Sequence, residues 1–148
     1  MKRLSKMGQY TFVYVDKDAE FWRTMGPLFT SKQIIKDLEG PMFDDDTYHW
    51  IIVYDDNYKI AGFTSLTTAR IDKGIIECTA AYVLPEHRHN GVYRELFKQR
   101  ALLGFELGAV ELRGVANPTS KKVFEDAGWK ATRTAGKWTH FRKATHNE

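Results

Sequence analysis

The residues best able to do chemistry lie at positions 82–94, which read YVLPEHRHNGVYR. An apolar strand ends at Pro85, a polar loop follows, and a helix begins just after Gly91. The first turn of a helix has backbone N–H groups without intrahelical partners, and the helix dipole adds partial positive charge there, so such a turn can hold phosphate oxygens. Gly91 lets the backbone approach a ligand closely, and Arg88 and Arg94 add formal charge. The stretch predicts a site for a phosphorylated cofactor, with an ordinary strand-to-helix connection as the alternative.

The elements that must position this loop follow from the spacing of apolar residues. Strands are predicted where apolar and polar residues alternate, or where β-branched and aromatic residues gather. They cover residues 10–15, 50–54, 60–68, 75–84, 110–115, 129–134 and 137–142. Capping residues and the helical period predict helices over residues 19–25, from the N-cap Ser31 to Gly40, over 92–107 and over 119–127.

The order of these elements predicts an α/β fold with a mixed sheet covered by helices. It reads β-α-α-β-β-β-α-β-α-β-β. The first helix is expected to begin after a capping Asp16 or Asp18 and to stop at Gly26-Pro27. A chain of 148 residues without repeats or linkers is the size of one domain, residues 1–148.

Composition and charge limit the kinds of ligand and the cellular compartment that we expect for the protein. The formal charge is +3, and the Lys and Arg residues are spread along the chain, which favours a small anionic ligand over nucleic acid. The only cysteine, Cys78, has no partner for an internal disulfide, as expected in a reducing cytoplasm. No segment reads as a signal peptide or membrane span. We therefore expect a soluble cytoplasmic protein that binds neither nucleic acid nor membranes, as a monomer or homodimer.

With these elements in place, the chain resembles the GNAT superfamily of N-acetyltransferases. The family has the same element order and binds acyl-CoA at the same strand-loop-helix. Its loop pattern is Arg or Gln, two residues, Gly, one residue, then Gly or Ala; here residues 88–93 read RHNGVY. Tyr93 departs at the last position, where a small residue normally leaves room beside the pyrophosphate. The resemblance therefore implies that the Tyr93 ring turns away or reshapes the site.

A second family signature lies at residues 117–129, which read NPTSKKVFEDAGW. Asn117 matches the residue whose amide commonly contacts the pantetheine arm. Phe124 stands where many members carry a tyrosine that protonates the leaving thiolate, which phenylalanine cannot do. A thiol has a pKa near 8.5, so its thiolate leaves well at neutral pH and an acid is helpful rather than obligatory. Water, or a hydroxyl of Ser120, Tyr93 or Tyr82, could replace it.

The resemblance implies a set of site residues along the strand and loop. The edge of the strand 75–84 would pair with the pantetheine amides, with the small residues 79–81 beside the arm or simply in the core. The backbone N–H around Val83 would stabilise the oxyanion. The implied contacts to acyl-CoA are Val83, Arg88, His89, Asn90, Gly91, Val92, Tyr93, Arg94 and Asn117.

Carboxylates offer two further roles. Glu77 stands eight residues before Pro85, where several family members carry the base that deprotonates the amine; the alternative is a structural carboxylate paired with Lys or Arg. The run at residues 44–46 could attract a cationic amine, or could cap backbone in a solvated loop. His87 and His89 lack partners at metal-ligand spacing, so no metal is expected.

Together these features predict an N-acyltransferase that uses acetyl-CoA. An acceptor amine would attack the thioester directly in a ternary complex, with Glu77 and Val83 as the catalytic residues. The alternative is a GNAT-fold protein that has lost catalysis and serves as a binding or structural component, which the departures at Tyr93 and Phe124 favour. The acceptor amine is left open.

Overall fold

The computed structural model describes residues 1–145, so the last three residues of the expected domain lie outside it. Eight strands form one sheet in the order β1-β2-β3-β4-β5-β6-β8-β7. All neighbours are antiparallel except β5 and β6, which run parallel. The strands are β1 (Lys2–Met7), β2 (Tyr10–Val15), β3 (Tyr48–Tyr54), β4 (Ile60–Thr67), β5 (Ile75–Val83), β6 (Glu111–Ala116), β7 (Lys130–Ala135) and β8 (Trp138–Ala144).

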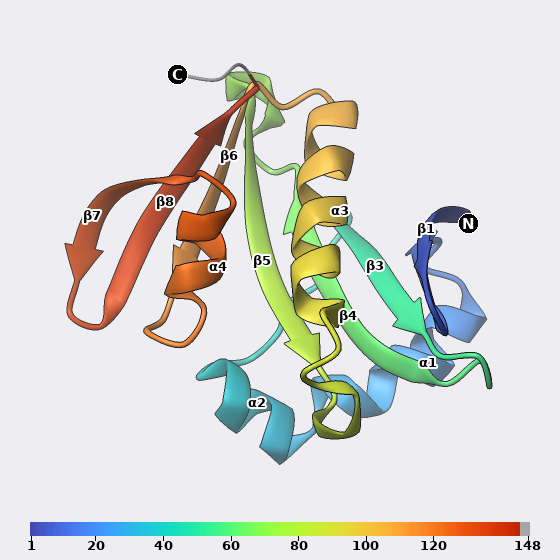
Figure 1. The fold of residues 1–148 in the computed structure, drawn as a ribbon. Helices are drawn as coiled ribbons and strands as arrows, with labels where there is room; N and C mark the ends of the chain where they lie inside the picture. The colour runs from blue at the N-terminus through green and yellow to red at the C-terminus, as the bar shows by residue number, and fades with distance from the viewer. Residues whose placement is uncertain (146–148) are drawn as a thin grey trace.

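Four α-helices cover the two faces of this mixed sheet (Figure 1). They are α1 (Ala19–Phe29), α2 (Lys32–Leu38), α3 (Val92–Glu106) and α4 (Lys121–Asp126), with short 3-10 turns η1 (Ile71–Lys73) and η2 (Pro85–His87). Because neighbouring strand residues face opposite sides, Ile51 and Val53 share one core with α3 and α4 residues, while Trp50 and Ile52 share the other with α1 and α2 residues. No helix in residues 1–145 is long and apolar enough to cross a membrane.

The predicted fold class is confirmed, with one correction to the element order and one to the end of a helix. The order omitted β1, a basic edge strand that pairs with β2 through a turn at Gly8. Its Lys and Arg side chains point to solvent, which is how natural sheets protect an edge, and they hide the strand pattern from a reading of the sequence. The stop predicted at Gly26-Pro27 is also wrong, because α1 runs through Pro27 to Phe29. The Phe29 ring packs on the Trp50 ring, with 5.4 Å between the ring centroids, and this contact helps to hold the last turn of α1.

The sheet opens between β5 and β6. Only the first residues of β5 pair with β6, Ile75–Glu77 against Glu111–Arg113. Beyond them the two strands diverge, as the ribbon shows from the top to the bottom of Figure 1. The single free cysteine of the chain, Cys78, is buried at the point of divergence.

A β-bulge lies in β5 at the same level. The register shifts between the pairs Leu66 with Cys78 and Thr64 with Ala81, so one β4 residue opposes two residues of β5. A bulge locally turns the backbone groups out of the ladder. Here the carbonyl of Thr79 accepts a hydrogen bond from α3 rather than from a neighbouring strand.

Candidate functional site

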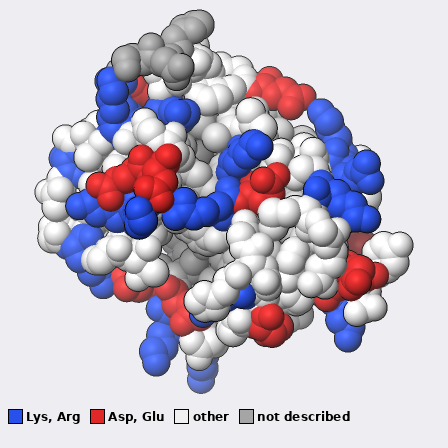
Figure 2. Space-filling view, in the orientation of Figure 1, with Lys and Arg blue, Asp and Glu red and all other residues white. Residues whose placement is uncertain are grey.

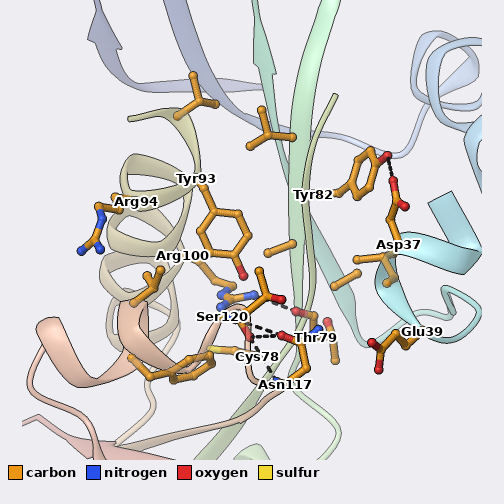
Figure 3. A pocket seen from close by; sticks show the side chains of 18 of the residues that line it. Asp37, Glu39, Cys78, Thr79, Tyr82, Tyr93, Arg94, Arg100, Asn117 and Ser120 are labelled. Carbon is orange, nitrogen blue, oxygen red and sulfur yellow. Dashed lines mark hydrogen bonds between the residues drawn. The ribbon is translucent and has the colours of Figure 1, made fainter. Parts of the chain in front are cut away.

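A cavity of about 760 Å³ occupies the opening between β5 and β6. One wall is β5 from Cys78 to Val83, and the opposite wall contains Val115, Asn117 and the start of α4. The first turn of α3 closes one end, and Asp37 and Glu39 of the α2 region lie at the other. The close view in Figure 3 shows these side chains converging from α2, α3, β5 and the loop before α4.

The edge of β5 offers its backbone to this cavity. The N–H of Leu84 donates to the carbonyl of Ala61 at 2.9 Å, so Leu84 faces β4. In an antiparallel pair, successive residues alternate between bonding the neighbour and facing away. The N–H and C=O of Val83 therefore point away from β4, into the opening. The N–H of Val83 on this edge can pair with an extended ligand, as an added strand would, while its carbonyl accepts from Arg88 at 3.0 Å.

The N-terminus of α3 carries free backbone donors to the same cavity. Its N-cap is Gly91, with a φ of 78° in the left-handed region that glycine tolerates, and no side chain of residues 1–145 caps this end. Gly91, Val92, Tyr93 and Arg94 all line the cavity. A 15-residue helix with an uncapped N-terminus is suited to hold an anion.

Arg88 lines the cavity and is held at the end of β5 by two contacts. Its Nε donates to the carbonyl of Val83 at 3.0 Å, and its Nη2 lies 3.4 Å from the carboxylate of Asp37. The guanidinium also lies over the Tyr82 ring, 5.3 Å from its centroid. Through these contacts Arg88 joins Asp37 of α2 to the end of β5.

The Asn90 side chain is held on the other side of the loop. Its side-chain amide donates to the Tyr10 hydroxyl at 3.2 Å and to the carbonyl of His87 at 3.3 Å. The Tyr10 hydroxyl is also hydrogen-bonded to Nδ1 of His87 at 3.0 Å. Asn90 thus braces the loop from the side of β2, and its side chain does not enter the cavity.

The remaining predicted binding residues lie around the cavity. Val83, His89, Val92, Tyr93 and Asn117 line it, together with Arg88, Gly91 and Arg94. The Asn117 carbonyl oxygen accepts from the N–H of Ser120 at 2.9 Å and from its hydroxyl at 3.1 Å, which fixes the turn before α4. Arg94 forms an ion pair with Asp126 of α4 at 3.0 Å, across the outer rim.

The α2 end of the cavity is polar and partly neutralised. The Tyr82 hydroxyl donates to Asp37 at 2.6 Å. This bond is the main cause that lowers the pKa of Asp37, while burial and the same bond raise the pKa of Tyr82 to about 12. Glu39 pairs with Lys137 at 2.6 Å. A cationic group that enters here meets two carboxylates whose charge is shared with Arg88 and Lys137.

Glu77 and the acidic run at residues 44–46 both have structural partners in the protein. Glu77 forms an ion pair with Arg70 at 3.1 Å, the structural alternative that the sequence left open, and the lining of the cavity begins one residue later. Asp44 accepts from the indole N–H of Trp50 at 2.9 Å and from Lys17 at 3.0 Å. Asp45 accepts from the N–H of Thr47 at 2.7 Å. The acidic run therefore caps its own loop and does not line the cavity.

Sequence reasoning missed Arg100, Asp37 and Glu39 as cavity residues. Arg100 is buried in the cavity wall, and its guanidinium donates to the freed carbonyl of Thr79 at 2.7 Å. A signal was present, because Arg100 stands four residues after Leu96 and three before Leu103, on the apolar stripe of α3. A cation at such a position calls for an explanation. Asp37 and Glu39 carried no comparable signal.

Charge on this side of the molecule is mixed. Figure 2 shows Lys and Arg side chains interspersed with Asp and Glu side chains around the central hollow, without a continuous basic field on this face. Ion pairs such as Arg94 with Asp126 and Lys122 with Asp126 contribute to this mixture. Such a surface is suited to a small ligand in a cleft better than to a nucleic-acid track.

Comparisons with known proteins agree with this geometry. The model of the acetyltransferase (GNAT) family matches residues 10–129. The spermidine N-acetyltransferase from Vibrio cholerae, solved with CoA and spermine, has 15% identity and a TM-score of 0.70, covering 92% of this chain and 94% of that one. A GNAT-family acetyltransferase from Staphylococcus aureus Mu50 has 9% identity and a TM-score of 0.70, covering 93% and 99%. No curated protein sequence matches the chain. The match of the family model over most of the chain identifies it as a member of the GNAT family of acetyltransferases.

Proposed function

We propose that the protein is an N-acyltransferase that transfers an acetyl group from acetyl-CoA to an amine by direct attack in a ternary complex. One observation supports this above the others. The opening between β5 and β6 exposes a strand edge at Val83 and ends at the uncapped first turn of α3. The edge fits the amides of a pantetheine arm, and the helix N-terminus fits a pyrophosphate.

Each end of the cavity has a role in this proposal. The N–H groups of Val92, Tyr93 and Arg94 hold the phosphates, and the Asn117 side chain lies beside the arm. The N–H of Val83, which points into the opening, stabilises the oxyanion that forms when the amine attacks. The amine enters from the α2 end, where Asp37 and Glu39 favour a cationic acceptor. The open cavity lets the amine release its proton to solvent.

The binding of acetyl-CoA is tested first, and the transfer of its acetyl group second. Calorimetry should give one acetyl-CoA per chain, and the melting temperature should rise once the ligand exceeds its dissociation constant. Mass spectrometry should then detect acetylation within a panel of amines comprising spermidine, a lysine peptide, a peptide with a free N-terminus, an aminoglycoside, an aminoacyl compound and an arylamine. No heat and no thermal shift at millimolar acetyl-CoA would remove the proposal.

A second candidate is a GNAT-fold protein that binds without catalysis. Phe124 favours it, because its ring is 3% exposed and stacked on Phe141, and it has no proton to donate. The Tyr93 ring also favours it, because it takes up part of the cavity (Figure 3). Binding of CoA without transfer to any amine of the panel, or to the small nucleophile hydroxylamine, would select this candidate.

A further inference from the structure

Arg100 is a buried cation in the wall of the cavity. It is 2% exposed, and its Nη1 donates only to neutral oxygens, the carbonyl of Thr79 at 2.7 Å and the hydroxyl of Thr64 at 2.8 Å. Its Nε is buried without a hydrogen-bond partner, and no carboxylate of residues 1–145 forms an ion pair with Arg100. A buried charge without a counter-charge is unfavourable. A group that acquires negative charge next to it would supply what is missing.

The Tyr93 hydroxyl lies beside this cation. Tyr93 and Arg100 are seven residues apart in α3, about two turns, and so project from the same side of the helix. Figure 3 shows the Tyr93 ring pointing from α3 into the cavity, with its hydroxyl toward Arg100 and Ser120. Burial raises the pKa of Tyr93, while the charge of Arg100 and the Ser120 hydroxyl act in the opposite direction. The phenol is therefore protonated at neutral pH and has a cation ready to stabilise its anion.

The hydroxyl groups of Tyr82 and Ser120 also line the cavity, and each is hydrogen-bonded to a neighbouring side chain. The Tyr82 hydroxyl donates to Asp37 at 2.6 Å, at the α2 end. The Ser120 hydroxyl donates to the side-chain oxygen of Asn117 at 3.1 Å. Phe124 has no hydroxyl, and its ring packs against Phe97 and Trp129. The Tyr93 hydroxyl, by contrast, points into the cavity toward the buried Arg100 cation (Figure 3).

We propose that the Tyr93 hydroxyl donates a hydrogen bond to the sulfur that leaves the acyl donor, and that Arg100 stabilises the negative charge on this sulfur, so that the site holds the leaving thiolate. The inference rests on the proposed acyl transfer and adds a catalytic residue on α3. The bond from the amine nitrogen to the acyl carbon forms, and the carbon–sulfur bond breaks with its electron pair on sulfur. The thiolate stays hydrogen-bonded to the Tyr93 hydroxyl beside Arg100 and takes a proton from solvent as CoA leaves. The amine gives one proton to solvent, so the protein returns to its starting state.

The first experiment measures transfer from acetyl-CoA to hydroxylamine by the Tyr93→Phe variant, which keeps the ring and removes the hydrogen-bond donor. We expect kcat to fall about tenfold, less than most general acids contribute because a thiolate leaves well unaided. The dissociation constant for acetyl-CoA should stay within about twofold of the wild type, since binding does not depend on the hydroxyl. The control is Tyr14→Phe, because the Tyr14 hydroxyl is hydrogen-bonded to His49 outside the cavity.

The second experiment uses binding alone to measure whether the site stabilises the thiolate form of CoA. Calorimetry compares CoA with desulfo-CoA between pH 6 and pH 9 for the wild type, Tyr93→Phe, Arg100→Met and Tyr14→Phe. If the site favours the thiolate, the affinity for CoA relative to desulfo-CoA rises with pH, about tenfold for each unit by which the thiol pKa is lowered on binding. The rise should be smaller in Tyr93→Phe and Arg100→Met and unchanged in Tyr14→Phe. A purely structural role for either residue would not move this ratio.

The outcomes separate the two proposals. A wild type that binds no CoA, or that binds it and acetylates neither hydroxylamine nor any amine, overturns the proposed function and this inference with it. A wild type that transfers acetyl groups while the ratio of CoA to desulfo-CoA affinity stays flat, or while Tyr93→Phe keeps full kcat, overturns this inference alone. If Arg100→Met does not fold, Arg100→Lys, which keeps the charge, should retain the pH dependence, and Tyr93→Phe still decides.

Discussion

At the scale of single residues, Glu77 illustrates how a partner decides the role of a carboxylate. The Glu77 side chain is 43% exposed and that of Arg70 is 38% exposed, so their ion pair is well solvated. Pairs of this kind contribute about 0–1 kcal/mol to the free energy of unfolding. The positive charge of Arg70 also favours the ionised carboxylate, which makes it a weaker base. The geometry thus supports a structural role for Glu77.

Replacing Glu77 with Gln tests that role. We expect Glu77→Gln to keep kcat within about threefold of the wild type with a lysine-like acceptor, and to lower the free energy of unfolding by about 1 kcal/mol or less. Steady-state kinetics and chemical denaturation measure the two quantities, and Arg70→Gln removes the same pair from the other side as a control. A large loss of kcat that recovers at high pH, where the amine is already neutral, would instead assign the proton to Glu77.

The binding residues divide into those that sequence could place and those that it could not. Gly91 and the first turn of α3 were predictable, because a glycine before a helix fixes the local backbone. The directions of Arg88 and Asn90 were not, because their partners Asp37 and Tyr10 lie 51 and 80 residues away along the chain. Partners that distant depend on the whole fold. A motif therefore locates a loop better than it orients the side chains on it.

At the scale of elements, the loop before α3 combines two left-handed residues. His89 has a φ of 67° and Gly91 a φ of 78°. A Cβ on Gly91 would meet nothing closer than the Met7 methyl at 3.8 Å, an ordinary contact. Gly91 is thus required by its backbone conformation and, in the proposed function, by the approach of the CoA phosphates, and not by crowding within the protein.

Substitution of Gly91 separates these two requirements. Gly91→Val should lower the free energy of unfolding by about 1–2 kcal/mol because of its left-handed backbone, and should raise the dissociation constant for CoA about tenfold or more. Gly136→Val is the matched control, with a φ of 60°, nothing within 4 Å of an added Cβ, and a position in the distant β7–β8 turn. It should lose similar stability and keep the affinity of the wild type. If Gly91→Val bound CoA as tightly as Gly136→Val, the CoA phosphates would not bind at the first turn of α3.

Strongly patterned elements were predictable, and exposed or irregular ones were not. The sequence predicted strands β3 and β4 and the long helix α3 from the spacing of their apolar residues. The structure buries these residues in the cores on the two faces of the sheet. β1 was missed because an edge strand needs few apolar residues. α1 passed through Pro27, where tertiary packing outweighed the local preference to stop. The bulge in β5 had no local signal, since it depends on Thr64 and Arg100 from other elements.

At the scale of the whole molecule, the opening in the sheet separates β1 to β5 from β6, β8 and β7. The two parts are joined by the pairing of Ile75–Glu77 with Glu111–Arg113 and by the N–H groups of Val110 and Glu111, which donate to the carbonyl of Gly74. An aromatic cluster of Phe97, Phe124, Trp129 and Phe141 ties the later strands to α3. A ligand in the opening contacts both parts at once, so binding should stabilise the arrangement of the entire sheet.

The claim that acyl-CoA lies along β5 with its phosphates at α3 is tested most directly by nuclear magnetic resonance of the nitrogen-15-labelled protein during titration with CoA. The largest and saturable shifts should occur at the amides of Val83, Val92, Tyr93 and Arg94. The amides of η1 (Ile71–Lys73), which does not line the cavity, should stay in place. Saturable binding that leaves those four amides unchanged, or no shift at all at millimolar CoA, would contradict the account.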